Sequence, residues 1–273
     1  MPAPLSSDDL AALLGSLPTN RRSVAYVDHR ATSQRPGYEI GTGGPEAALL
    51  THYTNGILDD QLVRDADIQS AVFSINSWST GAAILLGDFS SFPVALHAAV
   101  EAGEVSHRSF RGVDVFTVLK YHDLYLALPD PGTLVAAMGE EDVSQRLLEE
   151  TVGLRLDGPN PLDSSLAAML RAVGPVHFLS VRYVSEGGSP EMAFFGGAGT
   201  LNADDTVDLA IYSEWVDEEE AQQVEATLAD YPLYGYNSGE RYPYTNVNLD
   251  GTSIVARAES VLDEDVGGIL LGN

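Results

Sequence analysis

Thr206–Ala229 (TVDLAIYSEWVDEEEAQQVEATLA) is the stretch that decides the fold class, because an alternating segment runs directly into a capped helix. Alternation up to Trp215 predicts a strand. Asp217 is the expected N-cap, and Glu220 follows three residues later, as in a capping box. Gly81–Ala102 (GAAILLGDFSSFPVALHAAVEA) has the same order, with Pro93 in the first helical turn. In the helix that follows Asp217, the inner face is expected to carry Ala221, Val224 and Leu228.

The chain outside these two stretches follows the same course twice. Helices are expected at Glu46–Gln61 and Leu162–Val173, and LALPDPGTLVAA (126–137) corresponds to NVNLDGTSIVARA (246–258). Leu134–Ala137 is expected to lead toward a helix over Glu140–Val152. Each pass therefore has the order α-β-β-α-β-β.

This order predicts an α+β fold of internally duplicated, ferredoxin-like units, or one merged sheet. The sheet is expected to be mainly antiparallel, with helices packed on one face. The predicted organisation is an N-terminal extension with one helix and one strand (1–45), a first repeat (46–155) and a second repeat (156–273).

The excess of acidic over basic residues indicates the salt environment of the protein and says little about its activity. The chain has 40 Asp and Glu against 14 Lys and Arg, with Lys120 as the single lysine and a net charge of -26. Such a charge destabilises a compact fold by self-repulsion unless it is screened. At molar salt the Debye length is about 3 Å. The composition therefore resembles that of a haloarchaeal protein, with an acidic protein of a GC-rich mesophile as the alternative.

Composition also excludes several classes of partner and chemistry. Few, scattered basic residues argue against nucleic acid and against an anionic membrane surface. No cysteine is present, so thiolate chemistry and disulfides are excluded. No apolar run of about 18 residues occurs, which predicts no transmembrane segment.

A family resemblance rests on the layout and on one trace in the second half. The trace is Ala221-x-x-Val224-x-x-x-Leu228, followed by tyrosines and by Asp250-Gly-Thr and Val255-x-x-Ala258. Over roughly 46–260 the chain resembles uncharacterised envelope lipoproteins and secreted proteins of bacteria and haloarchaea. The resemblance implies an extracytoplasmic, non-enzymatic module, and it supplies no catalytic residues.

No motif assigns a reaction or a cofactor. The six histidines show no His-x-His or His-x-x-x-His pair, so His97, His122 and His177 are expected to be packed or boundary residues. The Gly41–Gly44 and Gly196–Gly199 clusters lack a P-loop lysine, and the second is expected to mark a bulge or a close backbone approach. A weak calcium site, with a solvated turn as the alternative, is formed by Asn202, Asp204 and Asp208.

The segment most suggestive of function is rich in tyrosine. It comprises Tyr231–Thr245 (YPLYGYNSGERYPYT), in which Gly235 and Gly239 are expected to serve turns. Tyr and Arg are enriched at binding surfaces, although an edge hairpin with tyrosines on a sheet face has the same pattern. The candidate binding residues are Tyr231, Tyr234, Tyr236, Arg241, Tyr242 and Tyr244.

These observations favour a non-enzymatic module that acts through protein or ligand contacts, at the cell envelope. The alternative is a cytoplasmic small-molecule-binding protein or an enzyme whose site is assembled from distant residues. A third option is a self-assembling subunit that docks through its apolar end, Asp265–Asn273, although such an end also serves as the last element of a core.

The charge balance generates the first testable prediction. Lowering KCl from molar to tens of millimolar is expected to unfold the chain, because the screening of its -26 net charge is withdrawn. Far-UV circular dichroism and the melting temperature measure this. An unchanged spectrum and melting temperature across the series would refute the halophilic interpretation.

Overall fold

The computed structural model describes residues 3–32, 67–77, 80–118, 124–184, 192–228, 230–235 and 237–271. The predicted helix at Glu46–Gln61, the Gly41–Gly44 cluster and His122 lie outside these residues. The chain divides into two compact units. Unit 1 consists of Met1–Ala11, Arg22–Thr51 and Leu162–Asn273, and unit 2 of Ala12–Arg21 and His52–Pro161.

Unit 2 is built on an antiparallel sheet with the strand order β2-β3-β7-β6-β5-β4. Its elements are β2 (Asp67–Ser77), β3 (Thr80–Asp88), α5 (Phe92–Glu101), β4 (Val105–Phe110), β5 (Val113–Val118), β6 (Leu124–Asp130), β7 (Thr133–Met138) and α6 (Glu141–Asp157).

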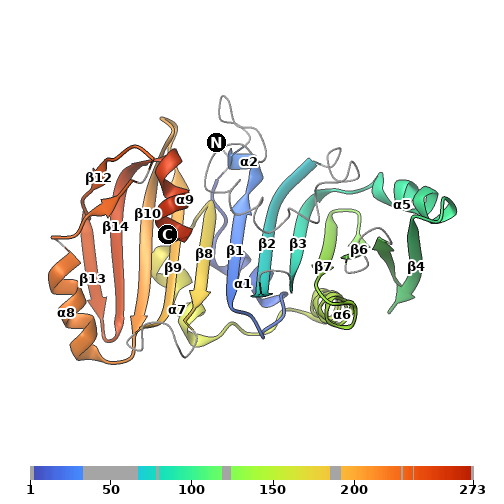
Figure 1. Cartoon of the computed structure of the whole chain (residues 1–273), viewed down its shortest axis with the longest axis horizontal. Coiled ribbons are helices and arrows are strands. Elements are labelled where there is room, and N and C mark those ends of the chain that lie inside the picture. Colours follow the sequence, from blue (N-terminus) through green and yellow to red (C-terminus); the bar gives the residue numbers. More distant parts are fainter. Residues whose placement is uncertain are drawn as a thin grey trace. The chain divides into compact units, whose positions relative to one another are not determined.

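In unit 1 the antiparallel strands have the order β13-β14-β10-β9-β8-β1. After α1 (Ser7–Gly15), its elements are β1 (Ser23–Asp28), α2 (His29–Thr32), α7 (Ser164–Val173), β8 (Phe178–Tyr183), β9 (Met192–Leu201), β10 (Thr206–Trp215), α8 (Glu218–Leu228), β13 (Asn246–Asp250), β14 (Ser253–Leu262) and α9 (Asp263–Leu271). A separate small hairpin pairs β11 (Leu233–Tyr234) with β12 (Arg241–Tyr242). Figure 1 shows the elements of both units.

The predicted α+β class with mainly antiparallel pairing is confirmed. In each unit a strand leads into a helix, and the final strand returns beside that first strand. In unit 2, β3 precedes α5 and pairs with β7. In unit 1, β10 precedes α8 and pairs with β14.

Local capping explains where helices begin. The predicted cap of α8 is confirmed, because the Glu220 amide donates to Asp217 Oδ1 at 2.9 Å. Helix α1 begins after Ser6, whose hydroxyl accepts from the Asp9 amide at 3.2 Å. Side-chain acceptors at this position satisfy amides that have no partner within the helix.

Leu134–Ala137 leads toward helix α6, as expected, and the structure shows that these residues themselves belong to strand β7. This strand pairs with both β3 and β6, and residues 133–137 are all buried. A strand covered on both faces loses its alternation, so a short apolar run cannot be told from a buried helix by periodicity. The following helix, α6, begins at Glu141, close to its predicted start.

Helices on opposite faces of the unit 1 sheet correct the expectation that helices pack on one face. Val266 of α9 packs with Leu209 of β10, whereas Met169 of α7 lies against Gly196 of β9. Gly196 pairs with Tyr212, which lies on the face opposite Leu209 because alternate residues point to opposite faces. In Figure 1, α7 lies behind this sheet and α9 in front of it.

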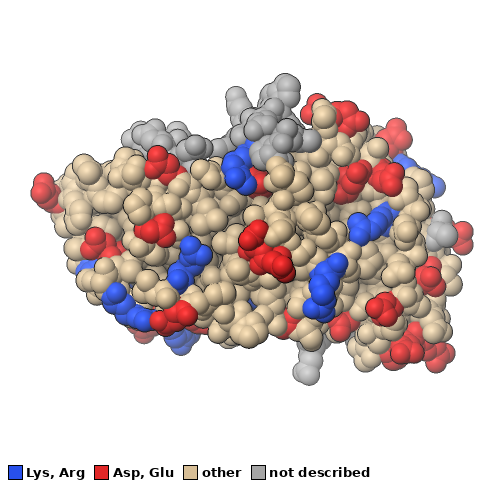
Figure 2. Space-filling model, turned by 180° about the vertical axis from the view of Figure 1, so that it is seen from behind, with Lys and Arg blue, Asp and Glu red and all other residues tan. Residues whose placement is uncertain are grey.

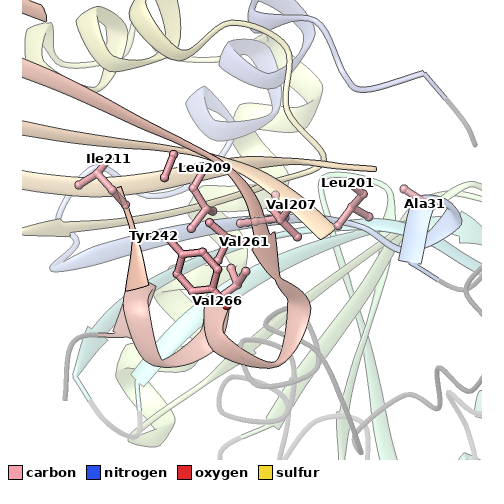
Figure 3. Close-up of a cluster of buried hydrophobic side chains, with 10 residues drawn as sticks. Ala31, Leu201, Val207, Leu209, Ile211, Tyr242, Val261 and Val266 are labelled. Carbon is pink, nitrogen blue, oxygen red and sulfur yellow. The ribbon is translucent and has the colours of Figure 1, made fainter. Parts of the chain in front are cut away.

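The α9 side of unit 1 carries a buried apolar cluster. Figure 3 shows Tyr242 pointing in among the aliphatic side chains of β10, β14 and α9. The buried members are Ala31, Phe178, Leu201, Val207, Leu209, Ile211, Tyr242, Ala258, Val261 and Val266. Burial of these apolar side chains contributes favourably to the free energy of folding.

The Gly196–Gly199 cluster marks a close backbone approach, as predicted. A Cβ at Gly196 would lie 2.7 Å from Met169 Cε. A Cβ at Gly199 would overlap the ring of Phe178, which is fully buried. These glycines therefore let side chains of both faces pack directly on β9.

Acidic side chains of the described residues are scattered over the face that Figure 2 draws. Figure 2 shows Asp and Glu spread over one face, with a few Lys and Arg between them. Among the described residues, no helix is long and apolar enough to cross a membrane.

The packing of Gly199 generates a stability prediction. Gly199→Ala is expected to lower the free energy of unfolding by about 1–3 kcal/mol, because the added methyl must displace the buried Phe178 ring. Gly153→Ala in α6 is the matched control, since its Cβ would meet only Arg111 Nη1, at 3.6 Å, and alanine favours a helix. Denaturation in molar KCl measures both. Equal effects of the two substitutions would contradict the packing argument.

Candidate functional site

The tyrosine-rich segment forms a hairpin next to α9. Leu233 pairs with Tyr242, and Tyr234 pairs with Arg241. We call Tyr231–Tyr244 the tyrosine hairpin. Directly paired side chains lie on one face of a ribbon, so the two pairs face opposite ways. Tyr242 is buried and Leu233 packs on the apolar cluster, whereas Tyr234 and Arg241 are exposed.

A single buried carboxylate fastens the hairpin to the rest of unit 1. Asp265, in the first turn of α9, is fully buried. Its Oδ1 accepts from the amides of Asn237 and Ser238, at 2.9 and 3.1 Å. Its Oδ2 accepts from the hydroxyls of Ser238 and Tyr242, at 2.5 and 2.6 Å. Four donors therefore converge on one side chain and fix the hairpin loop on α9.

These donors also decide the ionisation of Asp265. Burial alone would raise the pKa of Asp265, because it penalises the charged form. The hydrogen bonds from Ser238, Tyr242 and the two amides outweigh burial and hold this pKa below its usual value. The carboxylate is therefore charged at neutral pH, and its hydrogen bonds are of the stronger, charge-assisted kind.

The two glycines of the hairpin have different roles. Gly239 has a φ of 78°, and its amide donates to the Gly235 carbonyl at 2.8 Å, which closes the turn. A Cβ at Gly235 would overlap the Asp265 carboxylate. Gly239 thus serves the turn as predicted, and Gly235 additionally makes room for Asp265.

The candidate binding residues divide into two groups. Tyr231 and Tyr234 are 71% and 49% exposed, and Arg241 is exposed. Tyr242 points inward to Asp265, and half-buried Tyr244 packs against the apolar cluster. Tyr236 lies outside the described residues. The outer surface therefore offers aromatic rings and a guanidinium, which suit contact and stacking.

The acidic loop at Asn202, Asp204 and Asp208 makes hydrogen bonds of its own. Asp204 Oδ1 accepts from the Thr206 hydroxyl at 2.7 Å, and Asp208 Oδ1 accepts from Asn202 Nδ2 at 3.0 Å. The Ser260 amide also donates to Asp208 Oδ1, at 3.2 Å. Across the part of the chain that the structure describes, no cluster of three or more His, Asp or Glu is arranged to hold a metal ion.

The histidines include one grouping that sequence spacing did not predict. His97 of α5 and His107 of β4 lie with ring centroids 5.1 Å apart, and both contact Phe116. His107 Nε2 lies 2.8 Å from Asp114 Oδ1. The pairing of His107 with Phe116 on β4 and β5 brings these rings together. His177 is buried, and its Nδ1 accepts from the Leu201 amide at 3.0 Å, as expected for a packed histidine.

Sequence reasoning also missed Asp265 and the buried acid Asp28. Asp28 accepts two side-chain hydrogen bonds from Arg30, at 3.2 and 3.1 Å. Next to it, burial lowers the pKa of His29 to about 4, against the opposing charge of Asp28. Among 40 acids, a buried one has no local sequence signal except apolar neighbours, such as Val27 before Asp28 and Val266 after Asp265.

Comparison with known proteins bears on the fold alone. No protein-family model and no curated protein matches the chain. Solved structures of the protein TP0453 are similar to it. Crystal form IV has a TM-score of 0.59 and 7% identity, covering 96% of this chain and 98% of that one. Crystal form III has a TM-score of 0.58 and 7% identity, covering 94% and 96%. The chain thus belongs to the class of mixed α+β proteins with an antiparallel sheet, and it shares the fold of TP0453.

The Asp265 network generates a prediction about pH. Asp265→Asn is expected to lower the free energy of unfolding at pH 7 by about 1–3 kcal/mol, because the amide nitrogen cannot accept from Ser238 and Tyr242. A lowered carboxyl pKa contributes stability above its unfolded value, about 3.9, and this contribution is lost as the pH falls through the folded value. The deficit of the variant is therefore expected to shrink below pH 4.

Denaturant titrations in molar KCl at pH 7 and at several pH values below 4 measure this difference. Glu264→Gln is the matched control, since Glu264 is the exposed neighbour in the same helical turn. A deficit that stays constant over the whole pH range would contradict a charged Asp265.

Proposed function

We propose that the protein is a non-enzymatic binding module that uses the exposed side of the tyrosine hairpin to contact a partner or ligand. The observation that carries the proposal is the exposure of Tyr231, Tyr234 and Arg241 on a hairpin that buried Asp265 holds in place. Tyrosine offers a large contact area with few rotatable bonds, and arginine adds stacking and directed hydrogen bonds.

Rigidity of the support favours binding over a purely structural role. A contact surface that is already ordered loses less conformational entropy when it binds. Tyr242 and Leu233 form the inner side of the hairpin, and Tyr234 and Arg241 lie on its exposed side. Tyr231 and Tyr234 are thus among the few large apolar side chains left exposed in the described chain.

We further propose that the module is internally duplicated, halophilic and located at the cell envelope. The shared return of β7 beside β3 and of β14 beside β10 supports duplication of ferredoxin-like units. The acidic composition supports a high-salt environment. A cytoplasmic module for small molecules, or an enzyme, is the alternative that the experiment must separate.

The test is a retention assay in molar KCl. The immobilised chain is exposed separately to solubilised envelope and to cytosol with its metabolites, both from the source cells. We expect an envelope component to be retained, and Tyr231→Ala/Tyr234→Ala to reduce its retention at least tenfold, because the exposed rings are removed.

Val94→Ala in α5 is the matched control, because this exposed apolar residue belongs to unit 2. It is expected to retain the component as well as the unaltered chain does. Retention of a cytosolic metabolite instead would favour the alternative. Equal retention by the double variant would exclude the tyrosine hairpin as the contact surface.

A further inference from the structure

Strand β13 stands at one end of the strand order of unit 1. Within the described chain it pairs only with β14, and its register runs without a bulge from Asn246 to Asp250. Natural edge strands are usually protected by lysine, proline or a bulge. The sequence of β13, NVNLD, has none of these. Its protective features are its brevity, five residues, and the charge of Asp250 at its end.

The end strand of unit 2 is protected differently. Strand β4 carries His107 and Arg108 in its centre. Arg108 Nη2 lies 2.8 Å from Glu149 Oε1, and His107 Nε2 lies 2.8 Å from Asp114 Oδ1. Charged groups held at an edge oppose the approach of another strand. The contrast makes β13 the end strand that is open to pairing.

The hairpin that joins β13 to β14 decides which backbone groups face outward. Asp250 pairs with Ser253 across a two-residue loop, and Gly251 has a φ of 60° whereas Thr252 has no positive φ. This is the type II′ pattern, whose closing pair is hydrogen-bonded. Hydrogen-bonded pairs alternate along an antiparallel ladder. The amides and carbonyls of Val247 and Leu249 therefore point away from β14.

The side chains of β13 complement a second copy of the same strand. In an antiparallel pair centred on Asn248, Val247 lies opposite Leu249 of the other copy, and Asn246 lies opposite Asp250. Apolar side chains thus meet apolar ones, an amide meets a carboxylate, and no two acids face each other. This register also pairs the outward groups of Val247 with those of Leu249, and Asn248 becomes a central pair without backbone hydrogen bonds.

We propose that two copies of the chain associate through antiparallel pairing of their β13 strands, with Asn248 on the two-fold axis. A two-fold interface uses the same patch on both copies, as this register requires. Asn246, Asn248 and Asp250 are exposed, whereas Val247 and Leu249 are half-buried on the face that α8 covers. The pair would therefore extend the sheet and leave the asparagine face accessible.

Charge makes this association dependent on salt. Two chains of net charge -26 repel one another at low ionic strength. At molar salt the Debye length of about 3 Å removes most of this repulsion. The hydrogen bonds between the strands act at shorter range and persist. Dimers are thus expected in molar KCl and at high protein concentration.

The test is disulfide cross-linking of single-cysteine variants. The chain has no cysteine of its own, so any disulfide must join the introduced residues. In Asn248→Cys the two thiols face each other in a pair whose Cα atoms are about 4.5 Å apart, a separation that a disulfide can span. In Asn246→Cys each thiol lies four residues from its counterpart, about 14 Å away, so no disulfide can form within the pair. Both positions are exposed on the same strand face, which makes the second variant a matched control.

Sedimentation equilibrium of the unaltered chain in molar KCl, together with disulfide formation in the two variants under mild oxidation, decides the proposal. We expect a monomer–dimer equilibrium, and dimer cross-linking at least tenfold faster for Asn248→Cys than for Asn246→Cys. Circular dichroism checks that both variants fold. A monomer at every concentration, or equal cross-linking of the two variants, overturns the proposal and leaves the edge to a strand of another protein.

Discussion

The return of β14 beside β10 is the constraint on which the rest of unit 1 depends. Because β14 pairs with β10, β13 becomes the end of the sheet and α9 begins above the apolar cluster. That position places Asp265 under the tyrosine hairpin. One strand pairing thus determines the open edge, the buried carboxylate and the exposed tyrosines together.

Salt screens the interactions of buried acidic side chains much less than those of exposed ones. Asp28 and Asp265 are buried, and their oxygens accept hydrogen bonds from Arg30 and from the hairpin, respectively. Interactions at such short range, away from water, are screened much less than surface charges. Surface acids, some of which also have partners, as Asp208 and Glu149 do, carry a large excess of negative charge that repels over longer distances. The hydrogen bonds of Asp265 fix the hairpin on α9, and they are screened less by salt than the repulsion between surface charges is.

The tyrosine hairpin and β13 are two surfaces of one unit with different chemistry. The hairpin presents aromatic rings and Arg241 on an ordered support. Strand β13 presents backbone groups, and Asp250 at its end is its single charged residue. Neither surface depends on attraction between net charges, which is weak at high ionic strength. Contact through rings and through backbone hydrogen bonds is compatible with the high-salt environment that we propose for the chain.

Local patterns in the sequence predicted several of the helices and strands, because capping and alternation depend on near neighbours. The strand into helix at Thr206–Ala229 and the cap at Asp217 are examples. Duplication and the envelope location stay predictions. Only the tertiary structure decided that helices lie on both faces of the unit 1 sheet, and which tyrosines are exposed. These depend on strand order and on contacts between distant residues, such as Asp265 with Ser238, which no local pattern encodes.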